Sequence, residues 1–83
     1  MTDQLIRVLL VDDHPIVIGG IRAFLEEAED IQVIGEAYNG IMAIQAYNQL
    51  KPDVTLMDLI MPEMDGIEAI GLITEDDPEA KIL

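Results

Sequence analysis

The sequence predicts an α/β fold in which helices cover both faces of a doubly wound parallel sheet. Short apolar runs rich in β-branched residues alternate with stretches whose apolar residues recur every three to four positions. This alternation is typical of parallel strands joined by crossover helices. In addition, acidic residues directly follow the first and third apolar runs. The predicted order is βαβαβα, followed by the beginning of a fourth strand.

The first strand is predicted over residues 6–11, Ile-Arg-Val-Leu-Leu-Val. A continuous apolar run of this length suits a strand that is covered on both faces. Pro15 suits the first turn of a helix, with Asp13 or His14 as its cap. The pattern predicts about four turns before Asp30, with apolar positions at Val17, Ile18, Ile21, Phe24, Leu25 and Ala28.

Gly19 and Gly20 lower the propensity of this helix by about 1 kcal/mol each relative to alanine. A close approach of the helix to the sheet would explain both glycines. The second strand, residues 31–37, alternates only in part and is predicted to lie nearer the sheet edge than the first.

A second amphipathic helix follows Asn39, which can cap it. Its apolar positions are Ile41, Ile44, Ala46, Tyr47 and Leu50. Pro52 ends this helix, because the residue before a proline is disfavoured in helical geometry.

The third strand, residues 54–57, leads directly into Asp58. A third helix is predicted over residues 66–75, with Glu68 outward and Ile67, Ile70 and Ile73 inward. Residues 80–83 are expected to begin a fourth strand.

The composition limits the possible functions. The 83 residues allow one small domain. Seventeen acidic residues against four basic ones give a net charge of −13, which argues against direct binding to nucleic acids or anionic membranes. The absence of cysteine excludes disulfides and zinc–thiolate sites. With neither a signal peptide nor a membrane-length apolar run, a cytoplasmic location is expected.

Three acidic residues stand at predicted strand ends. Asp12 and Asp13 follow the first strand, and Asp58 follows the third. Each alone could serve as a cap or turn residue. If the strand order is 2-1-3, however, all three carboxylates meet at one sheet edge. Mg²⁺ would offset their repulsion, and Asp58 could then act as the nucleophile in phosphoryl transfer.

Two segments resemble the receiver domain of two-component response regulators: Leu-Leu-Val-Asp-Asp-His-Pro (residues 9–15) and Asp-Val-Thr-Leu-Met-Asp-Leu-Ile-Met-Pro-Glu-Met-Asp-Gly (residues 53–66). The opening Asp-Asp-His-Pro and residues 77–83 resemble the NarL-like subfamily, which carries a LuxR-type DNA-binding output domain. The resemblance implies a flavodoxin-like (CheY-like) fold and a role in phosphorelay signal transduction rather than an enzyme.

The resemblance implies that Asp58 accepts a phosphoryl group from a sensor histidine kinase. Asp13 would ligate Mg²⁺ directly and Asp12 through a water, with the backbone carbonyl of Ile60 as a further ligand. Pro62 and Gly66 match the loop that shapes the site. His14 matches a loop position to which the family gives no chemical role.

The chain is expected to be the N-terminal part of a receiver domain, residues 1–83, truncated after the start of strand four. The Ser or Thr and the Lys that the family has at the ends of strands four and five have no counterpart in these residues. The strand at residues 54–57 would then have an open edge and invite a homodimer or a domain-swapped oligomer. The alternative function is therefore a phosphorylation-incompetent module that acts by dimerising.

Two other classes fit less well. Phosphohydrolases of the haloacid-dehalogenase type have a second aspartate two residues after the nucleophile, and this position is Ile60. A flavin-binding protein would need a phosphate-cradling loop after the first strand, and the sequence has none there.

Overall fold

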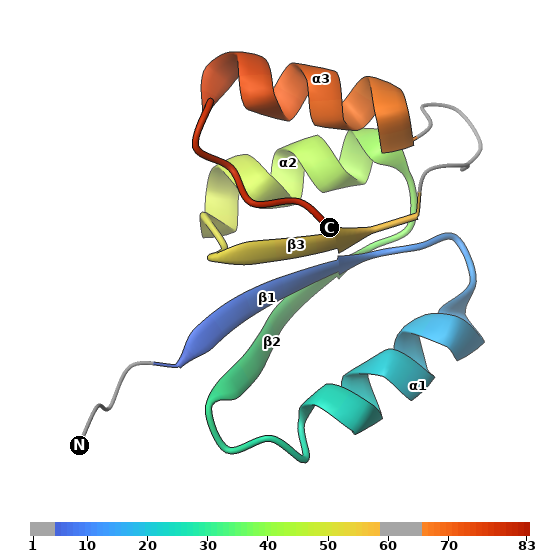
Figure 1. The fold of residues 1–83 in the computed structure, drawn as a ribbon. Coiled ribbons are helices and arrows are strands. Elements are labelled where there is room, and N and C mark those ends of the chain that lie inside the picture. The colour runs from blue at the N-terminus through green and yellow to red at the C-terminus, as the bar shows by residue number, and fades with distance from the viewer. Residues whose placement is uncertain (1–4, 59–65) are drawn as a thin grey trace.

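The computed structural model describes residues 5–58 and 66–83, and it confirms the predicted order of elements. The elements are β1 (Ile6–Val11), α1 (Pro15–Leu25), β2 (Ile31–Ala37), α2 (Gly40–Leu50), β3 (Val54–Met57) and α3 (Gly66–Asp76). The strands run parallel in the order β2-β1-β3, so β2 is an edge strand as predicted. The chain moves along the sheet in opposite directions in its first two crossovers. Right-handed connections therefore place α1 on one face and α2, with α3, on the other (Figure 1).

The central strand β1 supplies both halves of the core. Val8 and Leu10 pack with Ile18 of α1, whereas Leu9 and Val11 pack beneath α2 and α3. The four residues are at most 4% exposed, as the continuous apolar run predicted. The alternation arises because successive side chains of a strand point to opposite faces. On α3, Ile73 is buried, Ile70 is half-buried and Glu68 is exposed, whereas the side chain of Ile67 lies outside the described part.

Residues 81–83 run parallel to β3 on the side away from β1 (Figure 1). The amide of Thr55 donates to the carbonyl of Lys81 at 2.9 Å, and the amide of Leu83 donates to the carbonyl of Thr55 at 2.8 Å. The start of a fourth strand is confirmed in this form. The expectation that β3 has an open edge is wrong, because these backbone groups are already paired.

Helix α1 is shorter than predicted. It ends at Leu25, after 11 residues, because the amides of Glu27 and Ala28 bond three residues back and tighten the last turn. The stripe that faces the sheet consists of Ile18, Ile21 and Leu25. The predictions that Val17 and Phe24 pack inward are wrong, since these side chains are 43% and 75% exposed. Each directly precedes a residue of the inward stripe, Ile18 or Leu25, and is therefore turned by about 100° from it around the helix axis.

The expectation that Gly19 and Gly20 allow a close approach of α1 to the sheet is also wrong. Both lie on the exposed side of α1, and an added Cβ would meet none of the described atoms within 4 Å. We therefore expect Gly19→Ala and Gly20→Ala each to raise the free energy of unfolding by about 0.5–1 kcal/mol, because alanine restricts the unfolded chain more. Urea denaturation followed by circular dichroism would measure this gain, and a loss of stability in both variants would contradict it.

The glycine that permits a close approach is Gly35 in β2. The register with β1 shifts between Val8 and Leu9, so that Ile34 is an extra residue in β2. A Cβ at Gly35 would lie 2.6 Å from Cδ1 of Leu50. The bulge and the missing side chain together let the C-terminal end of α2 pack against the sheet.

Both ends of α2 are capped, but by groups at very different distances in sequence. At the start, Oδ1 of Asn39 accepts the amide hydrogen of Met42 at 2.8 Å, which confirms the predicted cap. At the end, the guanidinium of Arg7 in β1 donates to the carbonyls of Leu50 and Lys51 at 2.6 and 2.8 Å. A cation at this position also interacts favourably with the negative end of the helix dipole.

Within α2, the predicted apolar stripe is only partly confirmed. Ala43 and Tyr47 are buried, and Ile44, Ala46 and Leu50 are half-buried against the same cluster. Ile41 is 43% exposed and does not belong to it. The inward stripe therefore begins two residues later than the sequence suggested.

Tyr47 links α2 to the turn after α3. Its hydroxyl donates to Oδ2 of Asp77 at 2.7 Å. Burial, followed by this hydrogen bond, raises the pKa of Tyr47 from 10.0 to about 12. The same bond is the first cause that lowers the pKa of the Asp77 carboxyl.

We expect the hydrogen bond between Tyr47 and Asp77 to stabilise the fold less at both extremes of pH. Because the folded pKa of Tyr47 is raised, its contribution is complete below pH 10 and is lost as the pH rises towards about 12. Because the folded pKa of Asp77 is lowered, its contribution is lost as the pH falls below the unfolded value, near 3.8. Unfolding free energies measured across these two windows should depend less on pH in Tyr47→Phe than in the wild type. Gln49→Ala, at an exposed position on the same helix, is the control, and an identical pH dependence of Tyr47→Phe and wild type would contradict the assignment.

Candidate functional site

The site lies where β1 and β3 end side by side. The chain leaves β1 towards β2 on one side and enters β3 on the other, so strand order reverses between β1 and β3. In open parallel sheets, ligands bind outside the carboxyl ends of the strands at this point. The amide of Asp12 donates to the carbonyl of Ala37 at 3.0 Å, and the amide of Asp58 donates to that of Val11 at 2.9 Å. These bonds continue the strand ladders and fix both acids at adjacent strand ends.

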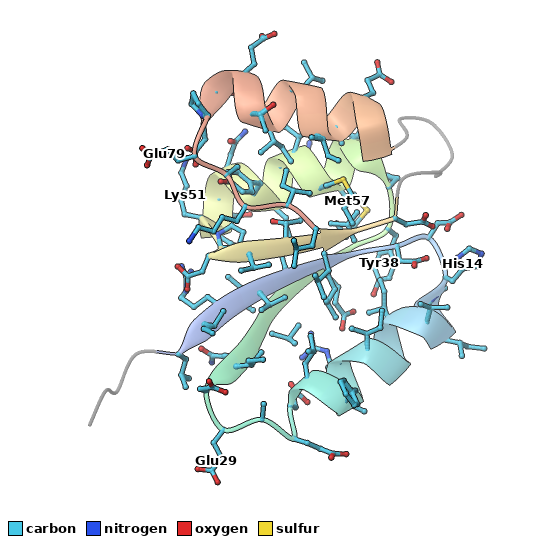
Figure 2. All side chains as sticks on the ribbon, viewed as in Figure 1. His14, Glu29, Tyr38, Lys51, Met57 and Glu79 are labelled. Atoms are coloured by element: carbon cyan, nitrogen blue, oxygen red, sulfur yellow. The ribbon has the colours of Figure 1, made fainter. Side chains whose placement is uncertain are left out.

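The structure brings the three predicted carboxylates together and adds a fourth group. Ligand atoms of Asp12, Asp13, His14 and Asp58 all lie within 4.8 Å of one another. Asp12, Asp13 and Asp58 are half-buried, whereas His14 is exposed. Figure 2 shows His14 on the turn from β1 to α1 and Met57 near the end of β3. The resemblance gave His14 no chemical role, yet its side chain belongs to this cluster.

His14 is held in place by Asp12. Oδ1 of Asp12 accepts both the backbone amide hydrogen of His14, at 2.9 Å, and a hydrogen bond from its ring Nδ1, at 2.8 Å. This bond is the first cause that raises the pKa of the His14 imidazole, and the charge of Asp13 is the second. His14 occupies the N-cap position of α1, but its side chain makes no capping hydrogen bond to the helix.

The hydrogen bond between His14 and Asp12 leaves one oxygen of Asp13 without a hydrogen bond from the described residues. Its Oδ1 lies 2.9 Å from Nδ1 of His14. A ring nitrogen carries one proton, and that proton is directed at Asp12. Oδ1 of Asp13 is shielded from solvent and accepts no hydrogen bond from the described residues. A shielded carboxylate oxygen of this kind fits a divalent cation, and the oxygen-rich donor set fits Mg²⁺.

A cavity of about 330 Å³ adjoins the acids on the α1 face of the sheet. Its lining is apolar except where Asp12 and Asp58 reach it, and it consists of Leu10, Val11, Asp12, Ile18, Ile21, Leu56, Met57, Asp58 and Leu83. The acids therefore stand at the junction of a polar edge and an apolar hollow. Of the other predicted site residues, Gly66 is the first residue of α3, and Ile60 and Pro62 lie outside the described residues.

The family model for the response regulator receiver domain matches residues 8–83. The chain belongs to this family. Receiver domains are signalling modules rather than classical enzymes, they generally bind Mg²⁺, and response regulators receive phosphoryl groups from histidine kinases. The match confirms both the predicted family and the CheY-like fold, of which the described sheet is an incomplete version.

Individual relatives agree with this assignment. The response regulator protein VraR of Staphylococcus aureus is 49% identical over 78 residues, which are 94% of this chain and 37% of the relative. A LuxR-family two-component response regulator from Aurantimonas sp. SI85-9A1 is 39% identical, with a TM-score of 0.90 over 95% of this chain and 56% of that one. The chain thus spans little more than a third of the length of its curated relatives.

A further solved structure is the CheX–CheY–BeF3–Mg²⁺ complex from Borrelia burgdorferi. It is 29% identical, with a TM-score of 0.84 over 92% of this receiver domain and 57% of that chain.

Among the helices that the structure describes, none is long and apolar enough to cross a membrane.

Proposed function

We propose that Asp58 accepts a phosphoryl group from a phosphohistidine of a sensor histidine kinase. The supporting observation is the convergence of Asp12, Asp13 and Asp58 from two adjacent strands onto one point, within 4.8 Å. A carboxylate at a strand end is an ordinary turn residue when it stands alone. Three of them in one place repel one another unless a cation or an incoming positive group binds there.

The proposed step is a displacement at phosphorus. An oxygen of Asp58 attacks phosphorus, a new O–P bond forms, and the bond between phosphorus and the imidazole nitrogen of the donor breaks. The electron pair stays on that nitrogen, which takes up a proton. The backbone bond from Asp58 to Val11 holds the acceptor at the end of β3.

Asp13 and Asp58 would hold Mg²⁺ directly and Asp12 through a water, together with the backbone carbonyl of Ile60. When bound, the ion neutralises the charge of the transferred group and of the carboxylates around it. The shielded Oδ1 of Asp13 is the described atom that best fits a direct ligand.

Incubation with acetyl phosphate and Mg²⁺ tests the proposal. We expect a mass increase of one phosphoryl group in the wild type, no increase in Asp58→Asn, and no increase when EDTA is added. Asp76→Asn is the matched control, because Asp76 is an exposed aspartate at the end of α3. Phosphorylation of Asp58→Asn at the wild-type level would overturn the assignment.

For the parent protein, we propose a cytoplasmic transcription regulator in which phosphorylation of this domain controls a LuxR-type DNA-binding domain. The similarity to VraR and to a LuxR-family regulator supports this proposal. The net charge of −13 leaves contact with DNA to the output domain.

A second candidate is a dimerising or domain-swapped module that is not phosphorylated. The backbone pairing of β3 with residues 81–83 weakens this candidate, because the edge of β3 is not open. Light scattering at micromolar concentration would detect the oligomer. A monomer that is phosphorylated on Asp58 would exclude this candidate.

A further inference from the structure

We propose that Asn39 is a site of spontaneous deamidation, and that opening of the first turn of α2 sets the rate. Of the two asparagines in the sequence, only Asn39 precedes a glycine, and no step of the proposed phosphoryl transfer uses it. Gly40 has no side chain, so its amide nitrogen can approach the Asn39 carboxamide more closely than a bulkier residue would allow. The other asparagine, Asn48, precedes Gln49 and lies within α2.

The reaction releases ammonia in its first step and consumes water in its second. The nitrogen of Gly40 loses its proton and attacks Cγ of Asn39, so that a C–N bond forms and the bond from Cγ to Nδ2 breaks. Nδ2 keeps the electron pair of that bond, takes up a proton and leaves as ammonia. Water then opens the five-membered ring at either of its two carbonyls, which gives aspartate or isoaspartate.

The fold holds Asn39 away from the geometry that this attack needs. Its Oδ1 accepts the amide hydrogen of Met42 at 2.8 Å, and its backbone carbonyl accepts that of Ala43 at 2.9 Å. Its backbone is extended, with φ −156° and ψ 173°. Ring closure needs the Cα–Cβ bond nearly eclipsed with the peptide bond to Gly40, whereas this ψ keeps the two bonds staggered. The carboxamide therefore reacts only after the first turn of α2 has opened.

The first turn of α2 can open without unfolding of the whole domain. It begins with a glycine, which is a poor helix former, and it contains no acidic residue that would stabilise the positive end of the helix. Ile41 and Met42 in this turn are 43% and 37% exposed. Helix ends of this kind open locally at a much lower free energy than the global transition.

The two products affect α2 differently. Aspartate caps a helix as well as asparagine does, and its charge favours the positive end of the dipole. Isoaspartate adds one carbon atom to the main chain, so the side chain no longer reaches the amide of Met42 as Asn39 does. The altered loop follows Ala37, whose carbonyl accepts the amide hydrogen of Asp12 at the candidate site.

Incubation of the full chain at mildly alkaline pH, followed by peptide mapping with mass spectrometry, tests the proposal. Each deamidation raises the mass of a peptide by about one dalton. We expect Asn39 to react about tenfold or more faster than Asn48 in the folded chain, and about tenfold or more slower than it does in urea. Equal rates at the two asparagines, or equal rates of Asn39 in the folded chain and in urea, would overturn the proposal.

Two variants at the exposed Ile41 test the role of the helix turn directly. In the folded chain, Ile41→Lys should deamidate about threefold or more faster than Ile41→Glu, because a cation destabilises the N-terminus of a helix and an anion stabilises it. In urea the helix is absent, so the ratio of the two rates measures only the direct effect of the charge and should be closer to one. The same ratio in both conditions would show that opening of α2 does not set the rate, and would overturn the proposal.

Discussion

Asp13→Asn should lower Mg²⁺ affinity by about 30-fold, or about 2 kcal/mol, while it stabilises the metal-free domain. With the ion bound, the substitution puts a neutral amide in place of a full negative charge, at a side chain whose shielded oxygen accepts no hydrogen bond from the described residues. Without the ion, the same charge repels Asp12 and Asp58, and an amide would relieve that repulsion. The gain in unfolding free energy should be about 0.5–1 kcal/mol, because His14 already offsets part of the repulsion.

Both effects can be measured on one preparation, by Mg²⁺ titration and by urea denaturation in EDTA. Glu29→Gln is the control, since it also removes one carboxylate charge but lies far from His14 and the site (Figure 2). It should leave Mg²⁺ affinity and stability nearly unchanged. A metal-free Asp13→Asn domain that is less stable than wild type would show that the carboxylates do not repel one another as the geometry indicates.

The second large effect is expected at Leu9, in the centre of the sheet. Leu9 is completely buried beneath α2 and α3. Leu9→Ala should lower the free energy of unfolding by about 3 kcal/mol, through lost burial and the cavity left behind. A chain of this length has roughly 4–12 kcal/mol in total, so the variant should be close to unfolding at 37 °C.

The matched control for Leu9→Ala is Ile16→Ala. It also removes an aliphatic side chain, but from a position that is 90% exposed. It should change stability by less than about 0.5 kcal/mol. Chemical denaturation of the two variants side by side gives the comparison. Equal losses would mean that the burial of β1 is not as the structure describes.

The two leucines of β1 and the aromatic residue of α1 show where sequence patterns succeed and fail. Leu9 and Leu10 were predicted to be buried because a continuous apolar run fits only a strand covered on both faces. Phe24 fitted the helical pattern equally well, yet it is exposed. Periodicity defines a face about 100° wide, but only contact with the sheet shows which edge of that face is covered.

The convergence of the three carboxylates could be predicted from the sequence, whereas their role in phosphoryl transfer stays a proposal. Asp12, Asp13 and Asp58 could be placed together because parallel strands gather their carboxyl ends at one edge. The contact of His14 with Asp12 could not, because it depends on the rotamer of an exposed ring. The available signal was the single histidine standing directly after two aspartates.

The sequence by itself determined the order of the elements, the Asn39 cap and the strand ends on which the acids stand. These features are local, since they depend on side-chain period, capping and proline geometry over a few residues. Only the tertiary structure decided that Arg7 caps α2, that Arg22 of α1 binds Glu36 of β2 at 2.6 Å, and that residues 81–83 cover β3. Each of these contacts joins groups 14 or more residues apart, so it forms only when packing has set the distance between the elements.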